Sequence, residues 1–257
     1  GYIFVQQKGH YLLKFKYLTP KIFIERSVLM FKNYNMNQLV LPLDLEDTRT
    51  LIPFLKQIEQ HYFELPKHIV ADAGYGSEQN YDDILSNRKR EALITYGMYV
   101  KEQKKKYRQN EFHSDNWQYD EENDVYTCPN QKRVTFKYHS VRTDRLDFTR
   151  EFKIYECENC SGCPFRSSCT KAKEGNNRKV MVNEKWEQQK EYVRAKLSEE
   201  KTGSIYRKRK IDVEPVFGFL KANLRFTRFS VRGKSKADNE MGLALMAVNL
   251  RKFTASS

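Results

Sequence analysis

The alternation of strand-like and helix-like segments between residues 68 and 96 constrains the fold most. The apolar run from His68 to Ala71 ends at Asp72 and is followed at once by a turn with two glycines. Ser77 is a suitable N-cap for a helix over 78–87, and a second apolar run occupies 92–96. A strand, a helix and a strand in succession are typical of neighbouring parallel strands in an α/β sheet. The sequence therefore predicts an α/β fold in which Asp72 lies at the open end of a buried strand.

Further helices are predicted on both sides of this unit. Asp47 or Thr48 is a suitable cap for a helix that ends before Pro66, with an apolar face of Leu51, Ile52, Leu55 and Ile58. Helical periodicity returns after residue 182, in a segment around 186–197 and again over 211–224 and 239–253. Residues 1–45 contain apolar clusters without a sustained period, and we expect short strands there.

The middle of the chain differs in character from both ends. A basic run over 101–108 leads into a strand-and-loop stretch that bears all five cysteines. We therefore expect an α/β core interrupted by a cysteine-rich insertion. The predicted boundaries are 1–104 for the first part of the core, with 1–45 poorly defined, 105–181 for the insertion and 182–257 for a helical second part of the core.

The spacing of the cysteines predicts a metal site. Four of them follow the pattern Cys157-x2-Cys160-x2-Cys163-x5-Cys169, and Cys128 lies upstream. Tetrahedral zinc takes four thiolates, which short Cys-x2-Cys turns supply in pairs, and such a site is structural because no position stays open for water. Five cysteines leave one spare. Unligated buried cysteines are the plainer alternative, and an iron–sulfur cluster is weaker because neither ferredoxin spacing is matched.

The clustering and odd number of the cysteines favour a cytoplasmic location over secretion. Thiolate metal binding suits the reducing cytoplasm, whereas paired disulfides suit secretion. The mean hydropathy of −0.79 and the absence of a long apolar run predict no membrane partner.

The charge of the chain points to DNA. The formal net charge is +13, and residues 201–236 hold eleven Lys and Arg against Asp212 and Glu214 alone, a surplus of nine. Tyr206, Phe226 and Phe229 are interleaved with these cations. A basic block of this kind is typical of a surface that follows a phosphate backbone.

Two carboxylates are the candidate reactive groups. Asp72 is expected at the carboxyl edge of the sheet, where open α/β sheets place their ligands, although a turn-capping Asp is the plainer interpretation. With Asp212 as N-cap, Glu214 and Lys221 lie two turns apart on one helix face, with Arg225 beyond them. A solvated charged face is the alternative there. Carboxylates hold divalent ions while Lys and Arg bind a nucleic-acid strand, which is the arrangement of a phosphoryl-transfer site.

These elements together resemble the DDE-type bacterial insertion-sequence transposases, over roughly residues 47–253. The segment from Ile69 to Ser77 is similar to the surroundings of that family's second catalytic Asp, and the segment from Val213 to Gly218 to those of its catalytic Glu. Lys221 follows Glu214 at the family's spacing. In the family's signature, an Arg stands four residues before the Glu, and this chain has Lys210 at that position. Tyr206 and Arg209 are three residues apart, as the Tyr and Arg of the signature are, but Arg209 stands one residue too early relative to Glu214.

The resemblance implies an RNase H-like mixed sheet with helices, the C-terminal portion of a transposase catalytic domain, and metal-dependent cleavage and transfer of DNA strands. It assigns Asp72 and Glu214 to Mg²⁺ or Mn²⁺. It assigns DNA binding at the insertion-sequence ends to Tyr206, Arg209, Lys210, Lys221 and Arg225. It selects Cys128, Cys160, Cys163 and Cys169 as zinc ligands, with Cys157 as the alternate, and it leaves a homodimer open.

One expected group has no counterpart. RNase H-like folds place a first catalytic Asp on the opening strand, and no carboxylate before Asp72 has that strand context. We therefore expect a truncated transposase that is inactive alone. The alternative function is a noncatalytic basic zinc-ribbon DNA-binding protein, in which both carboxylates are structural.

Overall fold

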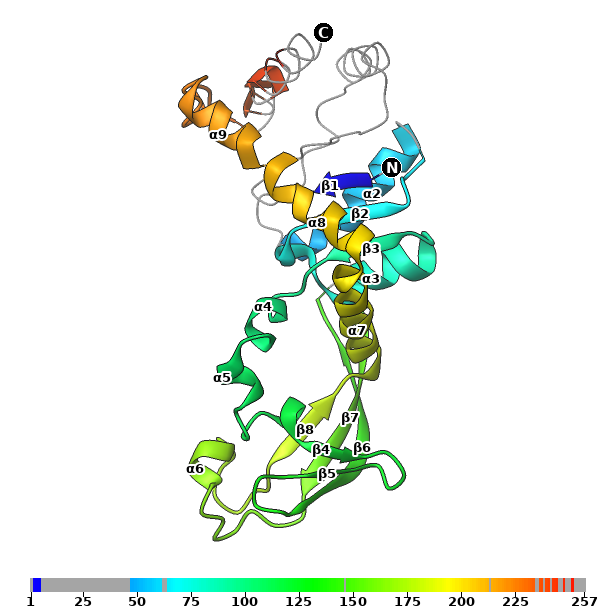
Figure 1. The fold of residues 1–257 in the computed structure, drawn as a ribbon, viewed down its shortest axis with the longest axis vertical. Coiled ribbons are helices and arrows are strands. Elements are labelled where there is room, and N and C mark those ends of the chain that lie inside the picture. The colour runs from blue at the N-terminus through cyan, green and yellow to red at the C-terminus, as the bar shows by residue number, and fades with distance from the viewer. Residues whose placement is uncertain are drawn as a thin grey trace. The chain divides into compact units, whose positions relative to one another are not determined.

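The computed structural model describes residues 2–5, 47–61, 64–145, 147–212 and 214–233, together with 236, 237, 239, 240, 242–244, 247 and 251. The chain divides into two compact units. Unit 1 comprises 1–96 and 193–257, and unit 2 comprises 97–192 (Figure 1). The short strands expected within 6–46 and most of the helix expected over 239–253 lie outside the described residues.

Unit 1 contains a parallel sheet of the predicted kind. Its strands are β1 (Tyr2–Val5), β2 (His68–Ala71) and β3 (Glu91–Ile94), hydrogen-bonded in that order and all parallel. Between β2 and β3 lie the helical turn η3 (Ala73–Tyr75), helix α3 (Glu78–Asp82) and the π-helical turn η4 (Asp83–Asn87). The strand–helix–strand prediction is therefore confirmed. Strands β2 and β3 are buried along almost their whole length, which is why they appear in the sequence as apolar runs.

The first predicted helix is also confirmed. The turn η2 (Asp47–Arg49) leads into α2 (Leu51–His61), which ends before Pro66. Leu51, Leu55 and Ile58 are fully buried on one face of α2, as the periodicity predicts, and Ile52 is half-buried beside them.

Three consecutive helices return the chain to this sheet. They are α7 (Glu184–Ser198), α8 (Glu200–Asp212) and α9 (Glu214–Ala222). Val70 of β2 and Leu93 of β3 form a buried cluster with Leu220 of α9, and Tyr206 of α8 packs against it. Burying a side chain of this size stabilises the fold by about 1.5–3 kcal/mol. This cluster fastens α8 and α9 to the sheet.

The N-cap expected at Asp212 is wrong. Asp212 is helical within α8, whose run from Glu200 contains no proline, and Glu214, the next described residue, begins α9. Pro215 is the second residue of α9.

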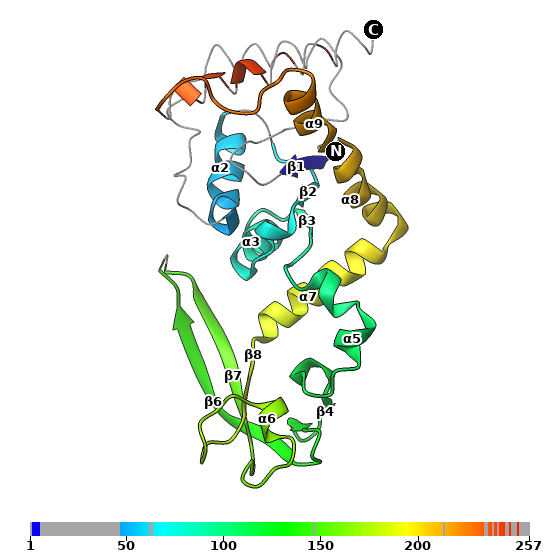
Figure 2. The same ribbon diagram turned by 90° about the vertical axis from the view of Figure 1, so that its left-hand side faces the viewer.

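Unit 2 is an antiparallel sheet with short helices. The strands β4 (Gln118–Asp120), β5 (Val125–Thr127), β6 (Arg133–Thr143), β7 (Thr149–Cys157) and β8 (Lys179–Val182) pair in sequence order. Strands β6 and β7 form a long hairpin (Figure 2). The short helices are α4 (Tyr99–Glu102), α5 (Lys105–Arg108), η5 (Ser114–Asn116) and α6 (Arg166–Cys169). The overall class is mixed α/β, with parallel strands in one unit and antiparallel strands in the other.

The core of unit 2 contains three of the five cysteines. Trp117, Val134, Tyr155 and Val180 are buried together with Cys128, Cys157 and Cys160. The expected boundaries of the insertion, 105–181, stay a prediction; unit 2 itself spans 97–192. No helix among the described residues is both long enough and apolar enough to span a bilayer.

Candidate functional site

Asp72 lies at the carboxyl edge of the parallel sheet. Strand β2 ends at Ala71, which is the register partner of Ile94 at the end of β3. Asp72 and Thr95 therefore follow directly at the same edge of the sheet. This is the edge at which open α/β sheets bind their ligands, and it agrees with the position that the sequence predicts for Asp72.

Helix α8 brings two side chains to this edge. Arg209 Nη1 donates a hydrogen bond to Asp72 Oδ1 at 2.8 Å, and the two side chains are 12% and 26% exposed. The Tyr206 hydroxyl lies 3.0 Å from Thr95 Oγ1. The Arg209 guanidinium lies 5.6 Å from the centroid of the Tyr206 ring. The cluster of Asp72, Thr95, Tyr206 and Arg209, called here the sheet-edge cluster, therefore joins residues more than a hundred positions apart.

The sheet-edge cluster has an unused donor. Arg209 Nε is buried and has no hydrogen-bond partner among the described residues. A buried donor without a partner costs about 1–3 kcal/mol, so native structures usually satisfy such groups with water, an ion or a ligand. A phosphate oxygen or a coordinated water is a group of the required kind. The donor set at this edge is thus one cation with a free N–H beside one carboxylate.

The turn after β2 is fixed by close backbone packing. A Cβ on Gly76 would lie 2.2 Å from the carbonyl oxygen of Thr95 and 2.7 Å from the Cα of Tyr96, so only glycine fits there. The buried Asn80 amide donates to the carbonyl oxygens of Thr48 and Tyr75, at 2.7 and 2.8 Å. These contacts hold the segment that carries Asp72 against the end of β3.

Ser77 is the N-cap that the sequence predicts. Its hydroxyl accepts a hydrogen bond from the backbone N–H of Asn80 at 3.3 Å. In the helix that follows, the buried Tyr81 hydroxyl donates to the Ile94 carbonyl at 2.9 Å, and burial raises the pKa of Tyr81 far above its ordinary value. Tyr81 therefore has a structural role, which is to link α3 to the end of β3, and it is not an acid–base group.

The other residues of the predicted site lie on or after α8 and α9. Glu214 begins α9, five residues after Arg209; its side chain and that of Lys210 lie outside the described side chains. Lys221 and Arg225 are exposed. Arg225, three residues after the end of α9, has φ +51°, and the backbone N–H of the next residue, Phe226, donates to the carbonyl of Leu220 at 2.9 Å. The convergence of Asp72 and Glu214 stays a prediction.

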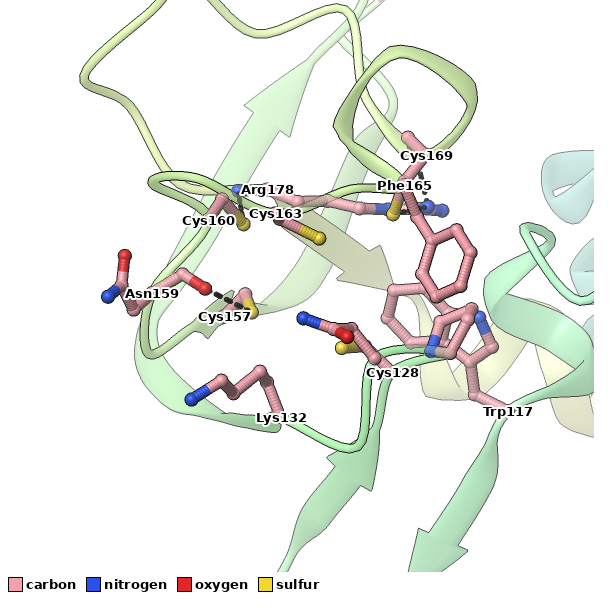
Figure 3. A pocket seen from close by; sticks show the side chains of 12 residues that line it. Trp117, Cys128, Lys132, Cys157, Asn159, Cys160, Cys163, Phe165, Cys169 and Arg178 are labelled. Atoms are coloured by element: carbon pink, nitrogen blue, oxygen red, sulfur yellow. Dashed lines mark hydrogen bonds between the residues drawn. The ribbon is translucent and has the colours of Figure 1, made fainter.

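A second cluster of reactive side chains lies in unit 2. All five cysteines line one pocket, together with Trp117, Phe165 and Arg178 (Figure 3). None of them is in a disulfide. Cys128 follows β5 and Cys157 ends β7, while Cys163 and Cys169 lie in the half-exposed segment that contains α6. We call this the cysteine pocket.

Hydrogen bonds distinguish the sulfur atoms of the cysteine pocket. The Arg178 backbone N–H donates to Cys160 Sγ at 3.3 Å, and its guanidinium Nη1 donates to Cys169 Sγ at 2.9 Å. Cys157 Sγ instead donates to the Asn159 carbonyl at 3.9 Å. Burial raises the pKa of the Cys157 thiol to about 12, so this thiol stays protonated at neutral pH.

The cysteines of the pocket are not arranged around a common centre that could hold an ion. Within the part of the chain that the structure describes, no three Cys, His, Asp or Glu side chains are arranged closely enough to hold a metal ion. The predicted zinc ligands therefore share one pocket, and binding an ion would require their sulfur atoms to move together.

Sequence reasoning misses three residues that the structure places in these clusters. Thr95 reaches Tyr206, Asn80 fixes the turn after β2, and Arg178 reaches two sulfur atoms. Thr95 has a weak signal, because it is the first polar residue after the apolar run of β3. Asn80 and Arg178 have none, because their partners are set by the folded chain.

Comparison with known protein families gives one match. Residues 127–254 match the family described as Transposase DDE domain. That match includes Tyr206, Arg209, Glu214 and the cysteines, whereas Asp72 lies before it. No solved structure matches the chain.

A second comparison concerns a curated protein. A type II restriction enzyme, CeqI of Rhodococcus hoagii, is 43% identical over 77 residues. These residues amount to 30% of this chain and a quarter of the length of that enzyme. Neither comparison points to a noncatalytic zinc-ribbon protein. The sequence signature and the family match agree, and residues 127–254 of this chain belong to the transposase DDE-domain family.

Proposed function

We propose that this chain is the DNA-processing part of an insertion-sequence transposase, which cleaves and joins DNA strands with the help of divalent metal ions. One observation carries the proposal: Arg209, inside the segment that matches the transposase family, bonds the carboxylate of Asp72 at the ligand-binding edge of the sheet. The name of the similar restriction enzyme is that of a nuclease, which agrees with chemistry on DNA.

Asp72 and Glu214 are the proposed ligands of Mg²⁺ or Mn²⁺. Carboxylate oxygens are the ligands that these ions prefer, and Glu214 starts the helix directly after the one that holds Arg209. A divalent ion at this edge would stabilise charge on a phosphodiester during its displacement. The Asp72 carboxylate is only partly buried, so it is accessible to an ion.

The helices α8 and α9 and the segment after them form the proposed DNA surface. Within the basic block 201–236, seven cations are exposed: Lys201, Arg207, Lys221, Arg225, Arg228, Arg232 and Lys236. Phe229 is 39% exposed among them and offers an apolar contact. Lys and Arg bound to phosphates release counterions, which gives affinity with little dependence on sequence. Lys221 and Arg225 follow Glu214 by seven and eleven residues. We propose Tyr206 and Lys210 as further contacts.

We also propose that the chain binds DNA without cleaving it when it acts alone. Strand β1, which lies beside β2, is Tyr-Ile-Phe-Val and offers no carboxylate to the site. A DDE site needs three acidic ligands to hold its ions in line with the phosphate. With two of them, ions and DNA are bound while turnover is lost.

The test combines metal binding with cleavage. We expect Mn²⁺ titration, followed by calorimetry or electron paramagnetic resonance, to show binding by the chain that Asp72→Asn and Glu214→Gln each weaken at least tenfold. Asp147→Asn, at an exposed turn of unit 2, is the matched control and leaves it unchanged. Mn²⁺ binding that is insensitive to both carboxylates contradicts the proposal. Robust nicking of duplex DNA, abolished by Asp72→Ala, would support the nuclease and refute inactivity of the chain alone.

For the cysteine pocket we propose structural zinc, held by Cys128, Cys160, Cys163 and Cys169. Thiolates are the preferred ligands of zinc, and the N–H groups directed at the sulfur atoms of Cys160 and Cys169 are of the kind that support bound thiolates. All five thiols are free, which suits a cytoplasmic location. Metal analysis of the purified chain is expected to find about one zinc per molecule. Iron with visible absorption, or no metal under reducing conditions, contradicts this.

A further inference from the structure

We infer that Arg178 is a positioning residue of the cysteine pocket: it holds two sulfur atoms for a thiophilic divalent ion and compensates the negative charge of the thiolate centre. The inference rests on the proposed zinc site and goes beyond it by naming a residue that is not a ligand. It concerns unit 2 alone.

The contacts of Arg178 link the part of the pocket next to the sheet with the part formed by α6. Its backbone N–H bonds the sulfur of Cys160, which follows the sheet, and its guanidinium bonds both the sulfur and the carbonyl oxygen of Cys169, the last residue of α6. Figure 3 shows the Arg178 side chain running from Cys160 towards Cys169 along one side of the pocket. One residue therefore sets the separation between a buried sulfur and a half-exposed one.

The guanidinium is itself held in place by groups other than the thiols. Its carbon lies 4.3 Å from the centroid of the Trp117 ring, and its second nitrogen donates to the Phe112 carbonyl at 3.0 Å. A planar guanidinium fixed on an aromatic face presents its remaining donors in one direction. Nη1 is the nitrogen that meets Cys169. Arg178 is thus preorganised before an ion arrives.

The charge of the occupied pocket explains why an arginine is needed. Four thiolates around a divalent cation carry a net charge of −2, and a buried charge of that size requires a compensating cation or strong donors. Lys132 also lines the pocket, and its ammonium lies 3.9 Å from Glu158, so its charge is partly used elsewhere. Arg178 brings its positive charge directly to a sulfur.

The same geometry gives Cys157 a different role from Cys160 and Cys169. Arg178 donates to the sulfur atoms of Cys160 and Cys169, whereas the sulfur of Cys157 interacts with Asn159 and Cys160. Acceptance of N–H bonds is what a metal-bound thiolate does. Arg178 therefore supports the ligand set that leaves Cys157 out.

The experiment measures metal affinity in the full chain. Zinc is removed and titrated back against a chromophoric chelator, and Co²⁺ is used in parallel because its sulfur-to-metal absorption band reports tetrahedral thiolate coordination. Outer residues of metal sites contribute about 10- to 100-fold to affinity. We expect Arg178→Gln to weaken binding of both ions by that factor and to alter the Co²⁺ band, and Arg178→Lys to recover part of the loss.

Arg166→Gln is the matched control. Arg166 also anchors this segment, through the carbonyl oxygens of Cys160, Ala172, Lys173 and Asn176, but its side chain contacts no sulfur in the described structure. We expect Arg166→Gln to change affinity less than threefold. Equal losses in both variants, or an unchanged affinity in Arg178→Gln, overturn the inference while leaving the zinc site intact. A wild-type chain that binds neither ion overturns both. Circular dichroism of each metal-free variant verifies that the sheet is retained.

Discussion

The two clusters of reactive side chains are built in opposite ways. The sheet-edge cluster joins Asp72 to Arg209 across 137 positions of the chain, and its groups are charged oxygen and nitrogen donors at the end of a parallel sheet. The cysteine pocket draws four of its five sulfur atoms from residues 157–169, within turns next to an antiparallel sheet. The first depends on long-range packing and the second mainly on local spacing. A pocket built mainly by local spacing, such as the cysteine pocket, is therefore much easier to predict from the sequence.

The difference extends to what each cluster is suited to hold. Carboxylate oxygen favours hard ions such as Mg²⁺, and thiolate sulfur favours zinc. The carboxylate at the sheet edge is partly exposed, as a site for a large substrate must be, whereas three cysteines are buried in a core. The proposed chemistry on DNA therefore belongs to unit 1, and the proposed structural zinc belongs to unit 2.

The largest expected effect would test whether DNA binding belongs to unit 1 alone. The triple change of Lys221, Arg228 and Arg232 to Gln removes three exposed cations of the basic block. Wild-type affinity for duplex DNA is expected to fall by about 10³ or more between 50 and 200 mM salt if about six phosphates are contacted. The triple variant is expected to reduce the slope of log affinity against log salt by about 2.7, measured by fluorescence anisotropy.

The matched control for this prediction removes the same charge from unit 2. Lys104, Lys105 and Lys106 are exposed at and before α5, and their triple change to Gln is expected to leave the slope nearly unaltered. Similar slopes in the two triple variants would show that DNA does not distinguish the units.

The second prediction tests which cysteines of the pocket bind zinc. Cys169→Ser removes a proposed ligand and is expected to abolish stoichiometric zinc, measured by metal analysis after gel filtration. Cys157→Ser is the internal control, because Arg178 donates to the sulfur atoms of Cys160 and Cys169, and the sulfur of Cys157 interacts with Asn159 instead. We expect this variant to retain zinc. The reverse outcome would move Cys157 into the ligand set and Cys169 out of it.

A smaller effect would test the packing that holds Asp72 in place. Gly76→Ala puts a methyl group against the backbone of Thr95 and Tyr96 and is expected to destabilise the chain by about 1–3 kcal/mol, measured by urea denaturation. Gly97→Ala is the control, because nothing lies within 4 Å of the added carbon. Equal stability of the two variants would show that the turn after β2 tolerates displacement.

The smallest effect concerns pH and the opposite edge of the parallel sheet. Burial lowers the pKa of His68 below 6.5, although Glu91, 3.2 Å away, opposes the shift. The unfolded chain then binds more protons than the folded chain below about pH 6.5, so stability falls as the pH drops from 7 to 5. His68→Gln is expected to flatten this part of the curve of unfolding free energy against pH.

His139→Gln, at an exposed position of β6, serves as the control for that measurement. A decline between pH 7 and 5 that is equally steep in wild type and His68→Gln would assign the acid sensitivity to other groups. Glu91 contributes in the same direction but at lower pH, because its own pKa lies below the ordinary value.

The sequence alone predicts the local elements well. The apolar runs at 69–71 and 92–94, the amphipathic face of α2 and the Ser77 cap each follow from neighbouring residues, and all are present in the structure. The parallel pairing of β2 and β3 also follows, because a helix between two strands returns the chain to the same end of the sheet. Asp212 misleads as an expected N-cap, because helix propensity carries α8 through it.

The resemblance to the transposase family and the positions of Asp72, Glu214 and the cysteines are likewise visible in the sequence, since each depends on residues a few positions apart. Only the tertiary structure decided that Arg209 meets Asp72, that Tyr206 meets Thr95 and that Arg178 reaches the sulfur atoms of Cys160 and Cys169. The physical reason is that α8 is placed by burial of its apolar side chains against Val70 and Leu93, a force without direction along the chain. Which polar groups then meet depends on the packed geometry, and spacing in the sequence does not encode it.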